Sequence, residues 1–420
     1  MSRLSQNGNR TSMPLSYYHK GLIVAAVAIF YTEVPIFVFE PSGWIAPKHW
    51  LIAFYLLALP LLVVQKTAWN ALKSPTTIWC LGYAGLTLLW FFLSSQSDTA
   101  WQEVRYRFLA ITQLLIFLMI FQESSAIKLA RKTLVAAVLF AVALNVYELF
   151  VPMAFSNVMG RSAGLYINPN IAGEALVLGM ILCTTVLAPR YRGPFILVIG
   201  IGILVTLSRA AIGMWLVAAA SLIFTREIRL KDLLLLGAVG LLLATMVVLP
   251  RWDQFVNSLE QTGVVNGDVL ERLDWLSNPV GVSDYSSWER KYLAQRAWNE
   301  ISERPFFGKG TGTSYESYTG THNQYLALMI DHGLIGVLIV PVLVFAATWG
   351  ALGRTKQIAI IFGCAILVLS VFSHNILTAS HSLILFTLMA AMAGTSVEHQ
   401  SNMTTTEAAV RGPGEVLVGA

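Results

Sequence analysis

Charged residues are scarce in this sequence. Asp, Glu, Lys and Arg make up 12% of its 420 residues, whereas a water-soluble surface needs about 25–35%. Hydrophobic residues make up 56% of the chain and its mean hydropathy is +0.64. This composition excludes a soluble enzyme and a disordered regulator, and it predicts an integral membrane protein in which lipid replaces water over most of the surface.

Cysteines are also few. Cys80, Cys183 and Cys364 lie far apart, each within an apolar run, so their spacing excludes a disulfide framework and a cysteine metal site. The histidines show neither the H-E-x-x-H motif nor the i, i+4 pairing of zinc sites. We therefore expect no metal and no cofactor.

Long apolar runs dominate the rest of the chain. They are too continuous for the alternating pattern of an outer-membrane barrel, and only helices or closed barrels span a bilayer. The sequence thus predicts an all-α integral membrane protein with about 12 transmembrane helices. The runs are near 21–38, 50–64, 76–94, 108–121, 133–152, 171–188, 194–208, 210–224, 233–249, 333–350, 357–372 and 376–394.

The run 194–224 decides the topology. A single helix over these residues would be about 46 Å long at 1.5 Å per residue, which is too long for one crossing. If the run crosses twice, the inner segments hold 16 basic residues and the short outer segments hold five, as the positive-inside rule requires. Both termini are then predicted to be cytoplasmic.

This topology divides the chain into five parts. Residues 1–20 form a cytoplasmic N-terminal segment without a cleavable signal peptide, and 21–250 hold transmembrane helices 1–9. Residues 251–321 form one long outer loop with amphipathic helices such as Trp288 to Glu303, whose apolar face is predicted to hold Tyr292, Leu293, Ala297, Trp298 and Ile301. Residues 322–394 hold a re-entering helix and helices 10–12, and 395–420 form a disordered cytoplasmic tail.

A glycine-rich segment, Gly308 to Gly312, ends the outer loop. It lacks the G-x-x-x-x-G-K-[ST] spacing of a phosphate-binding loop, and no strand precedes it. We expect a tight turn that acts as a hinge or a lid.

Three arginines and one histidine on the predicted outer side are candidates for chemistry: Arg161, Arg209, Arg290 and His322. An arginine drawn into hydrocarbon needs a partner or a watery cavity, and its planar donors suit phosphate oxygens. Histidine can accept a proton near neutral pH. The implied substrate is anionic and is expected to be a lipid phosphate.

Each candidate also has a plainer explanation. Arg209 can extend toward the outer headgroups, Arg290 can be a solvated helix residue, and Asn170 can be a helix N-cap. His322 can be an interfacial anchor, in which case other histidines compete for the role of base. The competing histidines are His332, His374 and His381.

The order of these motifs resembles that of the O-antigen ligase and polymerase superfamily, over roughly residues 150–340. One departure is Gly213, where some ligases have leucine in an R-x3-L pattern. His322 and Gly333 reproduce the H-x10-G spacing of the ligases. The motifs are Arg161-x-x-Gly164, Asn168-Pro169-Asn170-x-x-Gly173, Ser208-Arg209, Arg290, Pro305-x-x-Gly308-x-Gly310-x-Gly312, His322-Asn323-x-Tyr325-Leu326, Gly333 and Gly336.

The resemblance implies a GT-C-like glycosyltransferase in the bacterial inner membrane with its active site facing the periplasm. Its donor would be a glycan on polyprenyl (undecaprenyl) diphosphate, and its acceptor the lipid A core oligosaccharide. Transfer would be metal-independent and would invert the anomeric centre. Arg161, Arg209 and Arg290 would bind the diphosphate and His322 would be the base, supported by Asn170, Asn323 and Tyr325.

Three other functions stay open. An O-antigen polymerase would use the same donor with another lipid-linked glycan as acceptor, and a protein O-oligosaccharyltransferase would use protein hydroxyls. A transporter of anionic lipids would be expected to show an internal repeat with interrupted helices, and the sequence shows no such symmetry. No nucleic-acid partner is expected.

Overall fold

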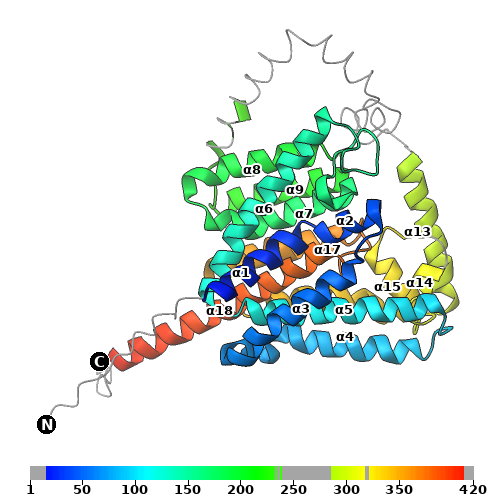
Figure 1. The fold of residues 1–420 in the computed structure, drawn as a ribbon, viewed down its shortest axis with the longest axis horizontal. Helices are drawn as coiled ribbons and strands as arrows, with labels where there is room; N and C mark the ends of the chain where they lie inside the picture. The colour runs from blue at the N-terminus through cyan, green and yellow to red at the C-terminus, as the bar shows by residue number, and fades with distance from the viewer. Residues whose placement is uncertain (1–15, 232–233, 235–236, 239–284, 317–320, 411–420) are drawn as a thin grey trace, which may run out of the picture.

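The computed structural model describes residues 16–231, 234, 237–238, 285–316 and 321–410, and these residues form helices joined by turns, with no strand among them (Figure 1). The η elements are 3-10 helices, except for η1, which is a π-helix. The elements in chain order are α1 Tyr17–Ala25, η1 Ala26–Tyr31, α2 Val34–Ser42, α3 Pro47–Val64, η2 Lys66–Lys73, α4 Pro75–Phe91, α5 Asp98–Ile120, α6 Ser124–Phe150, η3 Gly164–Tyr166, α7 Pro169–Cys183, η4 Thr184–Val186, α8 Pro189–Leu204, α9 Arg209–Phe224, α13 Tyr285–Glu303, α14 Thr313–Glu316, α15 Gln324–His332, η6 Gly333–Ile335, α16 Gly336–Thr348, α17 Gly353–Leu369 and α18 Ser380–Val410.

Several helices begin at residues whose side chains bind the free backbone N–H groups of a first turn. Ser74 accepts a hydrogen bond from the backbone of Thr77 at the start of α4, and Ser97 accepts one from Ala100 at the start of α5. Proline follows the cap in α4 and α7, where its missing N–H has no partner to lose. These caps fix where the helices start.

The helices include several candidate membrane spans. Four segments are long and apolar enough to cross a bilayer, and the pair Tyr17–Tyr31 and Val34–Glu40, bent by 48°, forms a fifth if it is counted as one span. The class of all-helical membrane protein is thereby confirmed. The count of twelve spans stays a prediction, and the predicted span 233–249 lies almost wholly outside the described residues. The four segments are Pro47–Val64, Ser124–Phe150, Pro169–Val186 and Gln324–Thr348.

The run 194–224 is divided into two helices. Helix α8 ends at Leu204 and α9 begins at Arg209, with Leu207 in a left-handed conformation (φ 50°) within the turn. The two helices pack closely, because a Cβ on Gly200 would lie 2.4 Å from the ring of Trp215. Trp215 Nε1 also donates to the carbonyl of Ile196 at 3.1 Å. A small residue at the crossing is a common way for membrane helices to approach each other.

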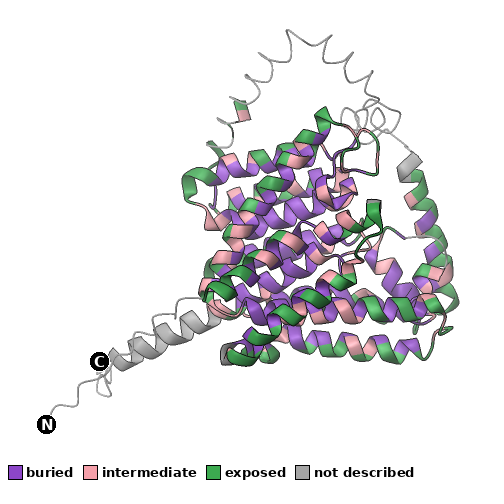
Figure 2. Ribbon diagram, in the orientation of Figure 1, coloured by how far each residue is buried: buried purple, intermediate pink, exposed green. Residues whose placement is uncertain are grey.

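Helix α7 lies in the centre of the molecule, whereas α3 lies at its margin. In the span Pro169–Val186, 78% of residues are buried inside the protein, compared with 28% in Pro47–Val64. Figure 2 shows this gradient, with buried residues in the middle of the helix stack and exposed ones along its edges. The exposed leucines of α3 are therefore expected to face lipid.

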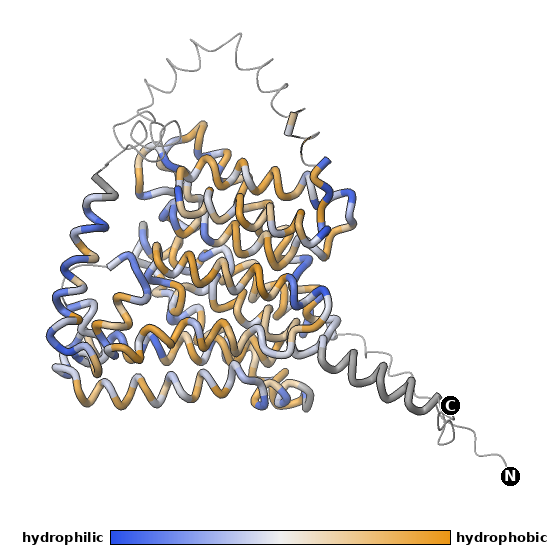
Figure 3. The backbone as a smooth tube through the Cα atoms, turned by 180° about the vertical axis from the view of Figure 1, so that it is seen from behind, coloured by the Kyte–Doolittle hydropathy of each residue, from blue (hydrophilic) through white to orange (hydrophobic). Residues whose placement is uncertain are grey.

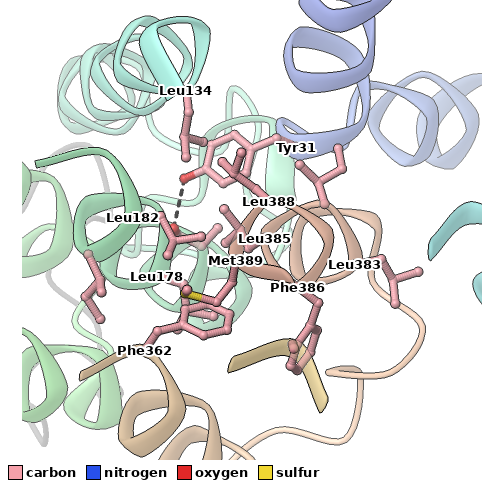
Figure 4. Close-up of a cluster of buried hydrophobic side chains, with 14 of the residues drawn as sticks. Tyr31, Leu134, Leu178, Leu182, Phe362, Leu383, Leu385, Phe386, Leu388 and Met389 are labelled. Carbon is pink, nitrogen blue, oxygen red and sulfur yellow. Dashed lines mark hydrogen bonds between the residues drawn. The ribbon is translucent and has the colours of Figure 1, made fainter. Parts of the chain in front are cut away.

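The central core joins helices that are distant in sequence. Tyr31, Leu178, Phe362 and Phe386 meet there in one buried cluster (Figure 4). Tyr31 donates its hydroxyl hydrogen to the carbonyl of Ala175 at 2.8 Å, so its polar atom is satisfied within the apolar core. This contact fixes the first helices against α7.

Helix α13 runs along one side of the helix stack, at a steep angle to α4 and α5 (Figure 1). Hydrophilic residues follow it and gather at the ends of the other helices, with apolar residues between (Figure 3). Leu293, Ala297 and Ile301 are buried, and the last two pack against Met329 and Ile330 of α15. Of the residues predicted to share the apolar face, Tyr292 and Trp298 are instead exposed.

The structure describes only part of the predicted terminal segments and of the predicted outer loop. Residues 1–15 lie outside the described residues, as do 251–284 of the predicted outer loop. Helix α18 continues beyond the predicted last span to Val410, so the predicted tail 395–420 is helical up to this residue. Residues 411–420 lie outside the described residues. The start of α1 and the end of α18 lie toward the same end of the molecule (Figure 1).

Candidate functional site

A pocket of about 70 Å³ lies where several helices begin or end. The starts of α7 and α9, helix α13, the residues before α15 and the turn after α17 all contribute to it. It is lined by Asn168, Asn170, Ile171, Glu174, Ser208, Ala210, Ala211, Arg290, His322, Leu369, Phe372, Ser373, His374 and Asn375.

Close backbone contacts bring these segments together. A Cβ on Gly173 would lie 2.6 Å from the Cβ of Ala211, so only glycine lets the start of α9 approach α7 this closely. The backbone N–H of Gln324 donates to the carbonyl of Ser370 at 2.8 Å. This bond holds the start of α15, and with it His322, beside the turn that carries His374.

His322 lies at the edge of the pocket, with part of its surface exposed and part of it buried. Its backbone is left-handed (φ 47°), an uncommon conformation for a residue other than glycine. Its ring packs edge to face on that of His374, with the ring centroids 5.3 Å apart. Partial burial and the nearby Arg290 guanidinium lower the pKa of His322, against a smaller opposing effect of Glu289. A lowered pKa favours the neutral imidazole, which is the form that can accept a proton.

Among the described residues that line the pocket, Arg290 is the only arginine. Helix α13 carries it on the side of Leu293 and Ala297, which are buried. Burial of this face therefore directs Arg290 toward His322. Two of the predicted groups, the arginine and the histidine, thus share one pocket.

Arg161 is linked to the pocket through Asn170. It is buried, with 6% of its surface exposed, and its Nε donates to the carbonyl of Thr206 at 3.0 Å. Its Nη2 donates to Asn170 Oδ1 at 2.9 Å, and Asn170 lines the pocket. The helix N-cap is Asn168 rather than Asn170, because Asn168 accepts the N–H of Asn170 at 2.9 Å. The side chain of Asn170 therefore does not cap the helix, and Asn170 lines the pocket.

Arg209 lies beside the pocket without lining it. It is the first residue of α9, between Ser208 and Ala210, which both line the pocket, and its side chain is half-buried. The structure therefore places Arg209 next to the site, outside the pocket wall that the described residues form.

The two supporting residues next to His322 serve the fold. Asn323 caps α15, since its Oδ1 accepts the backbone N–H groups of Tyr325 at 2.9 Å and Leu326 at 3.1 Å. The hydroxyl of Tyr325 donates to the carbonyl of Leu367 at 3.0 Å. These contacts position the start of α15, and neither side chain lines the pocket as the structure describes it.

Glu174 was missed in the sequence analysis. It is 4% exposed and lines the pocket one turn beyond Asn170. The sequence did indicate a functional residue here, because Glu174 is the only acidic residue in the apolar run 171–188. A carboxylate in such a run is usually functional. His374, expected only as a competitor of His322, lies in the same pocket.

The glycine-rich segment is hydrogen-bonded to the end of α15. The Asp331 carboxylate accepts the backbone N–H groups of Gly312 at 3.1 Å and Ser314 at 2.9 Å, and it also binds Arg107 of α5. A Cβ on Gly310, whose φ is 106°, would lie 2.4 Å from the Cα of Ser94. These contacts describe a close-packed structural turn, in contrast to the expected hinge or lid.

Gly333 of the H-x10-G spacing has a similar structural role. Its φ is 66°, and a Cβ there would lie 2.4 Å from the backbone of Phe306. The backbone N–H of Leu334 meanwhile donates to the carbonyl of Pro305 at 2.9 Å. Because Gly333 has no side chain, the turn after α13 can pack on the end of α15, the helix that begins just after His322.

Gly333→Ala is expected to destabilise the protein by about 1–3 kcal/mol, because alanine is strained in this conformation and also meets backbone atoms. Thermal unfolding in detergent measures the effect. Gly213→Ala is the matched control, since nothing lies within 4 Å of its added Cβ and alanine favours a helix. An equal loss in both variants would show that the conformation of Gly333 is not the cause.

A family model relates the region of this site to known proteins. No curated protein matches the chain. A family model described as O-Antigen ligase matches residues 194–341, a range that runs from α8 into α16 and contains Arg209, Arg290, His322 and Gly333. Over this region the chain is similar to the O-antigen ligase family.

Proposed function

We propose that this protein is an O-antigen ligase, a membrane glycosyltransferase that moves a glycan from polyprenyl (undecaprenyl) diphosphate onto the lipid A core oligosaccharide. The match to the O-antigen ligase family over residues 194–341 supports ligase or polymerase activity in general. The observation that carries the finer proposal is the shared pocket of Arg290 and His322, because an arginine there can bind a diphosphate and a histidine there can act as a base.

The proposed reaction needs no nucleotide, because the donor's diphosphate is already a good leaving group. The acceptor hydroxyl gives its proton to His322 while its oxygen forms a bond to the anomeric carbon. The bond between that carbon and the phosphate oxygen breaks, and the diphosphate leaves with both electrons of this bond. Displacement from the opposite face inverts the anomeric centre.

Arg290 is proposed to stabilise the charge that develops on the leaving diphosphate. Charge-assisted hydrogen bonds from a guanidinium to phosphate oxygens are among the strong ones in proteins, and they matter most where charge appears in the transition state. Arg161 contributes by holding Asn170 at the pocket wall, at 2.9 Å. Arg209 is proposed to add positive charge beside the pocket.

We place the pocket on the periplasmic side of the inner membrane, with a GT-C-like arrangement of about twelve spans and both termini in the cytoplasm. The positive-inside distribution of basic residues supports this orientation. The pocket lies at the starts of α7, α9 and α15, which are predicted to be their outer ends. The lipid-linked donor and the lipid A core would then meet in the same leaflet.

Deletion of the gene in a host with O-antigen on its lipopolysaccharide tests the proposal. We expect the core to lose all O-antigen while lipid-linked polymer accumulates, and wild-type protein to restore the O-antigen. A core that carries a single repeat instead identifies a polymerase. Unchanged lipopolysaccharide with underglycosylated proteins points to a protein oligosaccharyltransferase.

A further inference from the structure

A buried carboxylate forms part of the wall of the pocket. Glu174 is 4% exposed and is the only acidic residue among the described residues that line the pocket. Burial of an ionised carboxylate is costly unless other groups bind it. Its presence beside a site proposed to bind a diphosphate therefore calls for an explanation, since two negative groups repel each other.

His381 and Ser382, at the start of α18, hold Glu174 in place. His381 Nε2 lies 3.4 Å from Glu174 Oε1, and the hydroxyl of Ser382 donates to the same oxygen at 3.3 Å. The other ring nitrogen of His381, Nδ1, lies 2.9 Å from Glu33 Oε1. Because both ring nitrogens face carboxylates, the protonated ring can donate a hydrogen bond to each of them.

Glu33 lies at the break in the first apolar span. It separates η1 from α2, where the chain bends by 48°, and its backbone is left-handed (φ 57°) although it is not glycine. Its carboxylate also accepts the backbone N–H of His381 at 3.0 Å. A strained break that presents a buried carboxylate to one histidine indicates a positioning role.

The pocket contains side chains that suit two different ligands. Arg290 and His322 suit an anionic diphosphate, whereas Glu174 repels a diphosphate and accepts hydrogen bonds from hydroxyl groups. We propose that Glu174 binds the hydroxyl of the acceptor sugar, and that His381 and Glu33 position its carboxylate. This inference rests on the proposed glycosyl transfer and adds a binding site for the second substrate.

Glu174→Gln tests the proposal in the full-length protein, reconstituted with a polyprenyl-diphosphate-linked glycan and purified core lipopolysaccharide. The KM for the acceptor is expected to rise about 10- to 100-fold, the effect of losing one hydrogen bond to a charged group. The Kd for the donor should stay as in the wild type. Glu174→Asp keeps the charge and should recover part of the loss.

The positioning residues call for a different measurement. His381→Gln and Glu33→Gln should raise the same KM by less than Glu174→Gln, and their effects should disappear when they are combined with Glu174→Gln. Ser382→Ala removes one hydrogen bond to Glu174 and offers a milder variant if the others fold poorly. Additive effects of His381→Gln and Glu174→Gln would show that His381 does not act through Glu174.

Glu148 is the matched control. It is 3% exposed, and it accepts backbone N–H groups of Ala163 at 2.8 Å and Gly164 at 3.1 Å, outside the pocket wall. Glu148→Gln should lower stability without changing the acceptor KM of the folded fraction. A well-folded Glu174→Gln protein with a wild-type acceptor KM, or with a parallel loss of donor binding, overturns the proposal. Absence of transfer by the wild-type protein rejects the proposed function together with this inference.

Discussion

His322→Ala is expected to lower turnover about 10²- to 10⁴-fold, the usual contribution of a general base, and to leave donor binding nearly unchanged. The pocket joins His322 to Arg290, but only the arginine is proposed to bind the diphosphate. Turnover and donor Kd should both be measured on the purified protein. His49→Ala is the control, because His49 is an exposed histidine at the start of α3.

The pH profile gives a second measure of His322. A base acts when it is unprotonated, so wild-type activity should rise with pH through the pKa of His322 and be level above it. That pKa is lowered below the usual value of about 6.5, by partial burial and then by Arg290, so the rise in activity should occur at lower pH than an unperturbed histidine would give. His374 has a pKa of about 4 because of its burial and of His322, and it is neutral over the same range.

Conservative variants test the plainer explanation for His322. If the residue only holds the turn before α15, His322→Asn should preserve transfer, because asparagine keeps a polar side chain and tolerates a left-handed backbone. Near-wild-type turnover in this variant would move the base to His374, the next histidine in the pocket. If His322→Asn instead binds the donor normally but its residual activity no longer rises with pH at the acidic end of the profile, the result supports His322 as the base.

The sequence predicted the helices better than it predicted the site. Apolar runs and polar breaks located the helices, because each membrane helix must satisfy its backbone polar groups within its own segment. The break at Ser208 was also predictable, since a helix over 194–224 exceeds the bilayer thickness. These are local properties, and they are visible within about 30 residues of sequence.

The site depends on contacts between distant segments. Asn168 and Asn170 are equally good caps by composition, and the structure distinguishes them because Arg161 binds the second one at 2.9 Å. Helical spacing grouped Tyr292 with Leu293, yet only Leu293 is buried, because the position of α15 decides which side of α13 is covered. No local pattern encodes either choice.

Glu174 also depends on contacts between distant segments. A lone glutamate in an apolar run is conspicuous, but its chemistry depends on His381, which lies 3.4 Å away and 207 residues later in the chain. Arg209 shows the opposite case, because its place between two apolar runs pointed to the site, whereas its neighbours rather than its own side chain line the pocket.

Arg290→Ala is expected to lower kcat/KM about 10²- to 10³-fold, the effect of removing one donor that stabilises developing charge. Donor binding should weaken as well, since the guanidinium is proposed to bind the ground-state diphosphate. Arg290→Lys should recover only part of the activity, because an ammonium cannot contact two phosphate oxygens with a planar pair of donors. Arg296→Ala on the same helix is the control, since Arg296 is exposed and lies outside the pocket wall as described.

A second effect of Arg290→Ala separates a role in the site from a role in the fold. The charge of Arg290 is one cause of the lowered pKa of His322, so its removal should raise that pKa toward the usual value. The acidic limb of the residual activity should then move to higher pH in Arg290→Ala and stay in place in Arg290→Lys, which keeps the positive charge. An unchanged limb in both variants, with unchanged donor binding, would mean that Arg290 is a solvated residue of α13 and that the diphosphate binds elsewhere, with Arg209 as the next candidate.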